Sequence, residues 1–395
     1  MSSTENAYGY QKKEFPKSIL AIGLILLVIG VGLAAVSFAV DNARASFNMI
    51  IVFMFVFSVG IGSLFLVALE YLVDAVWSVP FRRLSEIFAA ALIIVPVLAI
   101  PVLLNLHDVF HWTHHEAVEA DKVLKGKEPY LNVPFFIIRF VVITLISWFF
   151  YTFITRFSRK QDNNPDQKYT RINIRFSAVF MPVFGIAMTI FAVDWMMSLE
   201  PHWFSTIFGV YYFSGTILAA LAVLTFAAVN LAEKGYLPGI RKDHYYNFGA
   251  LLFAFTNFWA YIAFSQFLLI WYANIPEETF WYIHRWEGSW MYISIALIIV
   301  RFVVPYAALL SQPSKSNPKN LKVISVWILF AHIFDLYWLI MPNFDHHGIV
   351  FGWMEVVFWI LGFGVVITVF ALAARNKNLL AVGDPKLSRG MEFHL

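Results

Sequence analysis

Residues 18–40 read SILAIGLILLVIGVGLAAVSFAV, a run of 23 residues in which Ser18 and Ser37 carry the only polar side chains. A helix of about 20 such residues crosses the hydrocarbon core of a bilayer, which is about 30 Å thick. The run follows Lys12, Lys13 and Lys17. It is longer than the roughly 7–15 apolar residues of a secretory signal, so we expect a membrane helix that is retained.

Nine further apolar stretches follow, separated by polar loops. The chain is 60% hydrophobic and 13% charged, whereas soluble domains are about 25% charged. We therefore predict an all-α polytopic membrane protein, with lipid as the solvent for most of its surface. Its ten transmembrane helices are expected at residues 18–40, 49–77, 83–105, 132–157, 172–199, 203–232, 244–273, 282–310, 320–341 and 348–374.

This pattern predicts one membrane domain over residues 18–374, between an N-terminal tail (1–17) and a C-terminal tail (375–395). Lysine and arginine gather on the side that holds both tails, and the loops of the opposite side hold only Arg44, Lys122, Lys125 and Lys127. Four more arginines fall within the predicted spans: Arg139, Arg175, Arg285 and Arg301. The positive-inside rule therefore places both termini in the cytoplasm. The net charge of +3 does not indicate nucleic-acid binding, because the basic residues flank the membrane.

The chain has no cysteine, which excludes disulfides, thiolate catalysis and a cysteine-held iron–sulfur cluster within it. The longest loop of the opposite, outer side, residues 106–131, is rich in histidine and acidic residues. A metal site is conceivable there, but no tight ligand pattern appears. We favour a solvated surface that docks a partner, and we interpret His284, Arg285, Glu287, Asp345, His346 and His347 near the same side as partner contacts too.

Two segments echo each other. One reads Asp194-Trp-Met-Met-Ser-Leu-Glu-Pro201 and the other Asp335-Leu-Tyr-Trp-Leu-Ile-Met-Pro342, so each aspartate stands seven residues before a proline. Four helices separate the two segments, and both run outward. This predicts two parallel four-helix bundles, helices 2–5 and 6–9, flanked by helices 1 and 10. Coincidence between two short segments is the alternative.

Ionisable groups within the spans should face the protein interior, and they are functional candidates. Glu70 and Asp74 are four residues apart and so share a helix face. Two close carboxylates disfavour double ionisation, so one of them should hold a proton and serve as a proton entry point. Pairing of these carboxylates with Arg82 or Arg83 is the alternative.

Deeper in the membrane, His332 and Asp335 share a face of the ninth helix, and an imidazole beside a carboxylate can exchange protons near neutral pH. Asp194 lies at a similar depth on the fifth helix, with Arg139 as the natural counter-ion for either aspartate. Proton conduction and a neutralised ion-pair network both fit these residues. A bis-histidine haem is disfavoured because His332 is the only deep histidine, and no Glu-x-x-His pair that would hold a di-metal site occurs within the spans.

The run Tyr130-Leu-Asn-Val-Pro-Phe-Phe-Ile-Ile-Arg139, the segment Asp194-Trp-Met-Met-Ser-Leu-Glu-Pro-His-Trp-Phe204 and the histidine-rich outer loop resemble one family. It comprises the NrfD/polysulfide-reductase-type membrane subunits, and within it those of bacterial alternative complex III. The resemblance covers essentially the whole chain. Its compact length and short tails are most similar to the second, smaller of the two such subunits of that complex.

The resemblance implies a place in a bacterial inner-membrane complex that oxidises menaquinol or ubiquinol. Electrons would pass through an iron–sulfur subunit and c-type cytochrome subunits on the outer side to a cytochrome c or a terminal oxidase. The iron–sulfur clusters and c-type haems would belong to these partners, and this chain would carry no redox cofactor. A larger homologous NrfD-like membrane subunit would be a further partner.

Three functions follow from these observations. The leading one is a subunit without a redox centre that supplies structure and a proton path through the buried carboxylates. That path would comprise Glu70, Asp74, His332, Asp335, Asp194 and Arg139. The alternative is a subunit that itself binds and oxidises quinol, with Asp194, His202, Arg139 and His332 as candidate contacts. The third is a secondary transporter, which is disfavoured because Pro201 and Pro342 stand at helix ends rather than mid-membrane.

Overall fold

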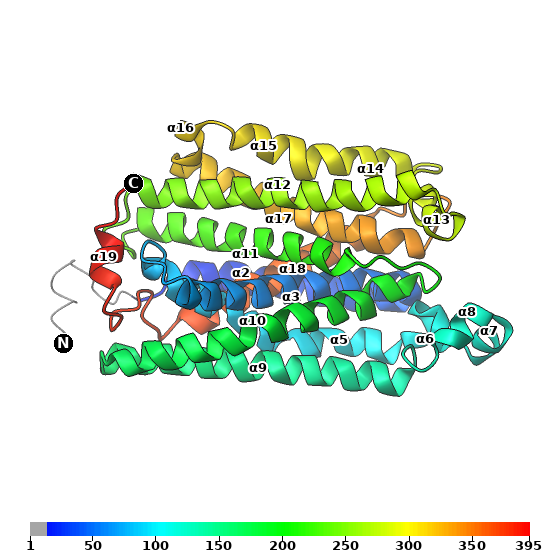
Figure 1. The fold of residues 1–395 in the computed structure, drawn as a ribbon, viewed down its shortest axis with the longest axis horizontal. Helices are drawn as coiled ribbons and strands as arrows, with labels where there is room; N and C mark the ends of the chain where they lie inside the picture. Colours follow the sequence, from blue (N-terminus) through cyan, green and yellow to red (C-terminus); the bar gives the residue numbers. More distant parts are fainter. Residues whose placement is uncertain (1–13) are drawn as a thin grey trace.

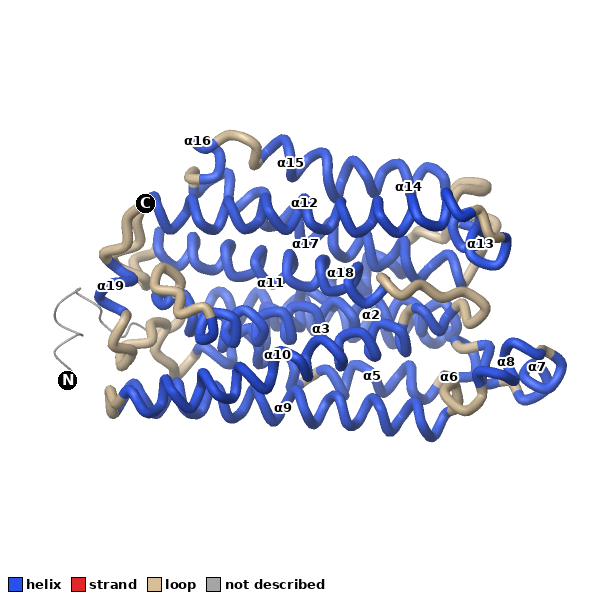
Figure 2. Tube along the Cα trace, viewed as in Figure 1, coloured by secondary structure: helices blue, strands red, loops and turns tan. Residues whose placement is uncertain are grey.

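A computed structural model describes residues 14–395, and every regular element in this range is a helix (Figure 2). Ten helical segments of the described chain are long and apolar enough to cross a membrane. The prediction of an all-α polytopic membrane protein with ten spans is therefore confirmed. Lys12, Lys13 and most of the predicted N-terminal tail lie outside the described residues.

Six spans are single helices, and four contain a change of helix type or a short extension. The single helices are α2 (Lys17–Val40), α3 (Asn42–Leu72), α9 (Val133–Asn163), α11 (Phe208–Glu233), α12 (Lys242–Ala273) and α18 (Trp353–Ala374). The third span joins η1 (Val79–Phe81), α4 (Arg82–Phe88), η2 (Ala89–Ile93) and α5 (Val95–Leu104). The fifth joins α10 (Gln167–Trp195) to η4 (Met197–Leu199), and the eighth joins α14 (Trp290–Ile298), η5 (Ile299–Val303) and α15 (Val304–Ala308). The ninth extends from α17 (Pro318–Ile340) through a short 3-10 turn to Asn343.

Short helices cap both ends of the molecule. They are α6 (Leu106–Val109), η3 (His111–Thr113), α7 (His115–Ala120), α8 (Lys122–Lys127), α13 (Pro276–His284), α16 (Gln312–Lys315), η6 (Met341–Asn343) and α19 (Leu387–Met391). We call the end that carries α7, α8 and α13 the α13 end, and the opposite end, where the chain terminates, the C-terminal end (Figure 1).

Some predicted helix boundaries were wrong. The second span begins at Asn42 rather than residue 49, because the Asp41 carboxylate caps the helix by accepting a hydrogen bond from the Arg44 amide. It also ends at Leu72 rather than residue 77. The predicted eighth helix, 282–310, divides into α13 and α14, and the turn between them contains Gly288 at a φ of +55°, a conformation that favours glycine.

Helix packing follows the same pattern in both halves of the chain. In the first half, α3 packs on α10 and on the third span, while α9 packs on α10. In the second half, α11 packs on α17 and α12, while α14 and α15 pack on α17. The first helices of the two sets, α3 and α11, contact each other at the centre of the molecule (Figure 1). This pattern agrees with the two predicted four-helix bundles, which we call the first and second bundles.

The outermost helices in sequence, α2 and α18, pair with each other, and α18 also packs on α3. Their backbones come very close, since a Cβ atom on Gly30 would lie 2.8 Å from the Leu361 Cα and one on Gly364 would lie 2.7 Å from the Leu27 amide nitrogen. Small residues allow this approach, which is a common basis for helix association in lipid.

The C-terminal segment is packed against the helices rather than free. Leu379, Leu380 and Leu387 are buried, and the Gly390 carbonyl lies 2.8 Å from Nε2 of His244 on α12. The Asp384 carboxylate accepts a hydrogen bond from the Arg82 guanidinium. The predicted tail 375–395 is thus part of the folded membrane domain's C-terminal end.

Candidate functional site

An ion pair lies at the α13 end of the first bundle. Arg139, near the start of α9, donates from Nε to Asp194 Oδ2 at 2.7 Å and from Nη2 to Oδ1 at 3.0 Å. Asp194 is 2% exposed and Arg139 7%. The predicted pairing of Arg139 with Asp194 is confirmed. The bidentate geometry occupies both carboxylate oxygens, which is the strong form of this interaction.

Tyr130 completes this arrangement from the segment before α9. Its hydroxyl donates to Asp194 Oδ1 at 2.9 Å, and its carbonyl accepts a hydrogen bond from Arg139 Nη1 at 2.8 Å. The guanidinium carbon lies 3.9 Å from the centre of the tyrosine ring, a cation–π distance. Burial, followed by the Asp194 charge, raises the pKa of Tyr130, so its phenol stays protonated.

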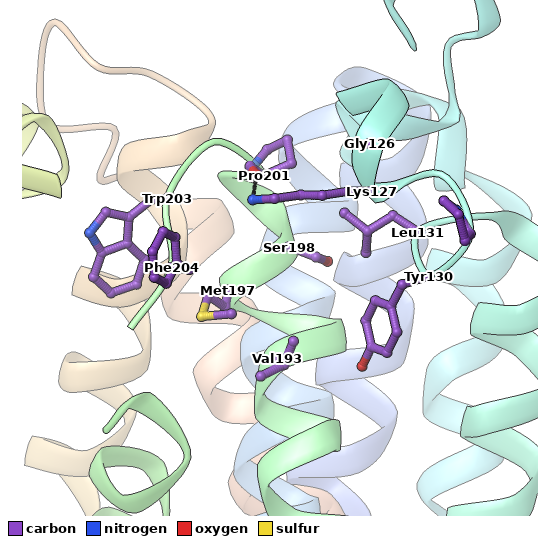
Figure 3. Close-up of a pocket in the computed structure, with 11 residues that line it drawn as sticks. Gly126, Lys127, Tyr130, Leu131, Val193, Met197, Ser198, Pro201, Trp203 and Phe204 are labelled. Carbon is purple, nitrogen blue, oxygen red and sulfur yellow. Dashed lines mark hydrogen bonds between the residues drawn. The ribbon is translucent and has the colours of Figure 1, made fainter. Parts of the chain in front are cut away.

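An apolar pocket opens beside Tyr130 (Figure 3). Its volume is about 360 Å³, within the range of small-molecule sites, about 300–1,000 Å³. The walls come from the α8–α9 connection, the end of α10 and the segment that leads to α11. The lining includes Lys127, Tyr130, Leu131, Val193, Met197, Trp203 and Phe204.

Besides the Ser198 hydroxyl, which donates to the Asp194 carbonyl of its own helix end, two polar side chains line this largely apolar space. One is the Tyr130 side chain, and the other is Lys127, whose ammonium spans the rim to donate to the Pro201 carbonyl at 2.5 Å (Figure 3). Burial lowers the pKa of Lys127. Trp203 fixes the opposite wall, because its ring stacks on that of Trp281 at a centroid distance of 4.4 Å.

A second buried aspartate lies in the equivalent helix of the second bundle. Asp335 on α17 accepts hydrogen bonds from Tyr211 Oη at 2.6 Å and Trp259 Nε1 at 3.1 Å. Its counter-ion is Arg301 in η5, with Nε 3.7 Å from Oδ2. In both bundles, therefore, the last helix supplies an aspartate and the preceding helix an arginine.

Arg301 also meets His332, whose Nδ1 lies 3.1 Å from Nη2. His332 Nε2 is buried and has no hydrogen-bond partner among the described residues. The π-helical turn around Arg301 has a local cause, because Pro305 has no backbone N–H to bond the Arg301 carbonyl four residues earlier. His332 thus belongs to the second-bundle cluster and does not line the pocket.

The expectation that Glu70 and Asp74 share a proton is wrong. The Glu70 carboxylate accepts a hydrogen bond from Arg82 Nε, which is the alternative pairing considered for it. Asp74 lies beyond the end of α3 with a φ of +56°, is 72% exposed and pairs with Lys386. The helix ends before Asp74, so the two carboxylates do not point into one site.

The remaining predicted contact, His202, also lies away from the pocket lining. Its Nε2 is 2.5 Å from Asp121 Oδ2, which ties this segment to the outer loop. Of the four predicted quinol contacts, only Asp194 and Arg139 lie beside the pocket. Both are hydrogen-bonded to Tyr130, which lines it. Sequence reasoning did not single out Tyr130 or Lys127, although Tyr130 begins the very motif that ends with Arg139.

A further ion pair joins the two ends of the sequence. Glu355, at the start of α18, accepts hydrogen bonds from Arg44 Nε at 2.9 Å and Nη2 at 2.6 Å. Asn48 Nδ2 donates to the same carboxylate at 2.9 Å. The two partners stand 311 positions apart in the sequence, so only helix packing brings them together.

No family model matches the chain, and no curated protein matches it significantly.

Proposed function

We propose that this chain is a quinol-binding membrane subunit of a bacterial inner-membrane oxidoreductase, of the NrfD/polysulfide-reductase type found in alternative complex III. The observation that carries the proposal is the apolar pocket at the α13 end, which is lined by Tyr130, a residue that is hydrogen-bonded to Asp194 and Arg139 beside the pocket. The quinone ring would pack between the aromatic and aliphatic walls formed by Trp203, Phe204 and Leu131.

The polar groups of the pocket match the head group of a quinol. A quinol hydroxyl can donate to the Tyr130 oxygen, whose own proton is directed at Asp194, and Lys127 can donate to the second oxygen. Arg139 holds Asp194 and the Tyr130 carbonyl together and so fixes the orientation of the tyrosine. Oxidation of one quinol would release two protons to the α13 side and two electrons to an iron–sulfur cluster in a partner subunit.

In this proposal the pocket lies at the outer face of the membrane. The positive-inside rule assigns the C-terminal end to the cytoplasm and the α13 end to the outside. There the iron–sulfur subunit and c-type cytochrome subunits, and a terminal oxidase where one is present, would dock close to the quinol. The larger NrfD-like subunit would pack on the lipid-facing helices.

A proton route from Glu70 through His332 to Asp335 and Asp194 is not part of this proposal. Each of these three carboxylates lies next to an arginine: Arg82, Arg301 and Arg139, respectively. A guanidinium does not release its proton, so an arginine at each step interrupts the relay. These pairs are better explained as links between helices. They are compatible with a structural role of the chain in its complex, but not with the proton path.

A transporter is also disfavoured. Transporters place helix breaks at corresponding mid-membrane positions of their two repeats. Among the described residues, the helix type changes in the middle of a span at η2 in the third span and at η5 in the eighth. These spans are the second helix of the first bundle and the third helix of the second bundle, so they do not correspond.

The test is photolabelling of the purified protein with a photoactivatable quinone analogue. We expect labelled peptides from residues 126–131 and 193–204. Val193→Trp should fill the pocket and reduce labelling at least tenfold. Ile186→Trp, on the same helix but 65% exposed on the lipid-facing surface, is the matched control and should label like the wild type.

Labelling that is equal in the Val193→Trp and Ile186→Trp variants would contradict the proposal. Labelling confined to another subunit of the complex would also contradict it.

A further inference from the structure

Three possible metal ligands meet at the α13 end, outside the membrane-spanning segments. Glu200, His284 and His346 each offer one ligand atom, and these atoms lie within 4.8 Å of one another. Glu200 follows η4, His284 ends α13, and His346 lies in the loop after η6. The three residues are far apart in sequence, so only the packing of the two bundles brings them together.

The two imidazoles of the cluster lie close together, and no hydrogen bond joins them within the described residues. Their ring centroids are 4.4 Å apart and the ring planes are inclined by 46°. Nδ1 of His346 is buried and has no hydrogen-bond partner among residues 14–395. An unpartnered buried nitrogen costs free energy, and a metal ion would satisfy it.

A neutral imidazole keeps a free lone pair for a metal ion. Burial lowers the pKa of both rings; the Arg285 charge adds to the shift of His284, and the charges of His284 and Arg285 add to that of His346. Burial raises the pKa of Glu200, and a bound cation would favour its charged form.

Arg285 is the nearby positive charge that could oppose a metal ion, and it is engaged elsewhere. Its guanidinium donates to the carbonyls of Trp281 at 3.0 Å and Leu339 at 2.8 Å and stacks over the Trp281 ring at 3.5 Å. No ion pair joins it to Glu200 in the described part of the chain. The nearest cationic candidate for Glu200 is His202, at 3.8 Å.

We propose that Glu200, His284 and His346 form a binding site for Zn²⁺ at the α13 end. Two neutral imidazoles and one carboxylate are a typical set of protein ligands for zinc, with a fourth position left to water or to another group. Imidazole disfavours Mg²⁺ and Ca²⁺, which prefer oxygen ligands. Zinc–nitrogen bonds of about 2.0–2.1 Å require the three side chains to close on the ion by small rotations.

Bound zinc would tie the first bundle to the second. Glu200 follows the last helix of the first bundle, whereas His284 and His346 belong to the second. Ser198 and Pro201, on either side of Glu200, line the pocket, so the ion would also hold one pocket wall in place. The site does not depend on quinol binding, and each proposal can fail without the other.

The test is equilibrium dialysis of the full-length protein in detergent against Zn²⁺, with the bound metal measured by elemental analysis. We expect one zinc per chain in the wild type. We expect at least tenfold weaker binding for Glu200→Gln and for the double variant His284→Ala/His346→Ala. His347→Ala, which changes the neighbouring histidine outside the cluster, is the matched control and should bind like the wild type.

Histidines of the outer loop are a second possible source of bound zinc. The triple variant His107→Ala/His111→Ala/His114→Ala should therefore keep its one zinc. Zinc should raise the melting temperature of the wild type and of His347→Ala but not of Glu200→Gln, which separates lost binding from a folding defect. X-ray absorption should show two imidazole ligands at about 2.0 Å.

Unchanged zinc content in both cluster variants would overturn the proposal. A spectrum without imidazole scattering would overturn it as well.

Discussion

At the scale of single residues, the buried carboxylates serve mainly to hold helices to one another. Asp194 on α10 pairs with Arg139 on α9, and Glu355 on α18 pairs with Arg44 on α3. Taking two charges out of water is costly, and their attraction repays this only when the geometry and the hydrogen bonds are good. Removing one partner is then much worse than removing both, because a lone buried charge remains.

Asp194→Asn should therefore destabilise the protein by about 3–5 kcal/mol, because it leaves the Arg139 charge unpaired within the membrane. The double variant Arg139→Leu/Asp194→Leu should recover most of that loss. The free energy of unfolding, measured by denaturation in detergent micelles, checks both. Exposed Glu116→Gln is the control and should stay within about 0.5 kcal/mol of the wild type. Equal losses in the single and double variants would contradict the ion-pair explanation.

At the scale of helices, close backbone approach determines how α2 joins the rest of the molecule. Gly30 faces α18, where an added Cβ would meet Leu361 Cα at 2.8 Å, whereas a Cβ on Gly32 would meet no atom within 4 Å. These two glycines are two residues apart on one helix, yet only Gly30 lies in the interface.

Gly30→Leu should force α2 and α18 apart and cost about 1–3 kcal/mol by overpacking. Gly32→Leu gains the same helix propensity but points away from α18, so it should be neutral or stabilising. The melting temperatures of both variants in the same detergent provide the comparison. If Gly30→Leu melts at or above the temperature of Gly32→Leu, α2 does not dock on α18 through this glycine.

At the scale of the whole molecule, the two bundles repeat one plan. Each has a central helix, α3 or α11, and each ends in a helix whose aspartate pairs with an arginine of the preceding span. The two bundles differ in the surroundings of this aspartate. An apolar pocket adjoins the aspartate cluster of the first bundle, whereas the second aspartate is enclosed by Tyr211, Trp259 and Arg301.

The proposed orientation can be checked with introduced cysteines, because the chain has none of its own. Glu116→Cys lies at the α13 end and Asn164→Cys at the C-terminal end, and both positions are exposed. In intact cells a membrane-impermeant maleimide should label Glu116→Cys only. After permeabilisation it should label both. Labelling of Asn164→Cys in intact cells would show that the orientation is opposite to the proposed one.

The sequence by itself determined the fold class, because twenty-residue apolar runs satisfy every backbone hydrogen bond internally and need only lipid around them. It also indicated three of the buried charged residues, since Asp194, Asp335 and Arg139 all stand within such runs. Local spacing did not reveal where a helix ends, so Asp74 was placed inside the membrane although α3 stops at Leu72.

Only the tertiary structure decided which charges meet. Arg44 and Glu355, or Glu200, His284 and His346, are brought together by helix packing over long sequence separations. The pocket likewise exists only where the α8–α9 connection crosses the end of α10. Hydropathy depends on each residue and its near neighbours, whereas a site depends on distances between helices, and no local pattern encodes those distances.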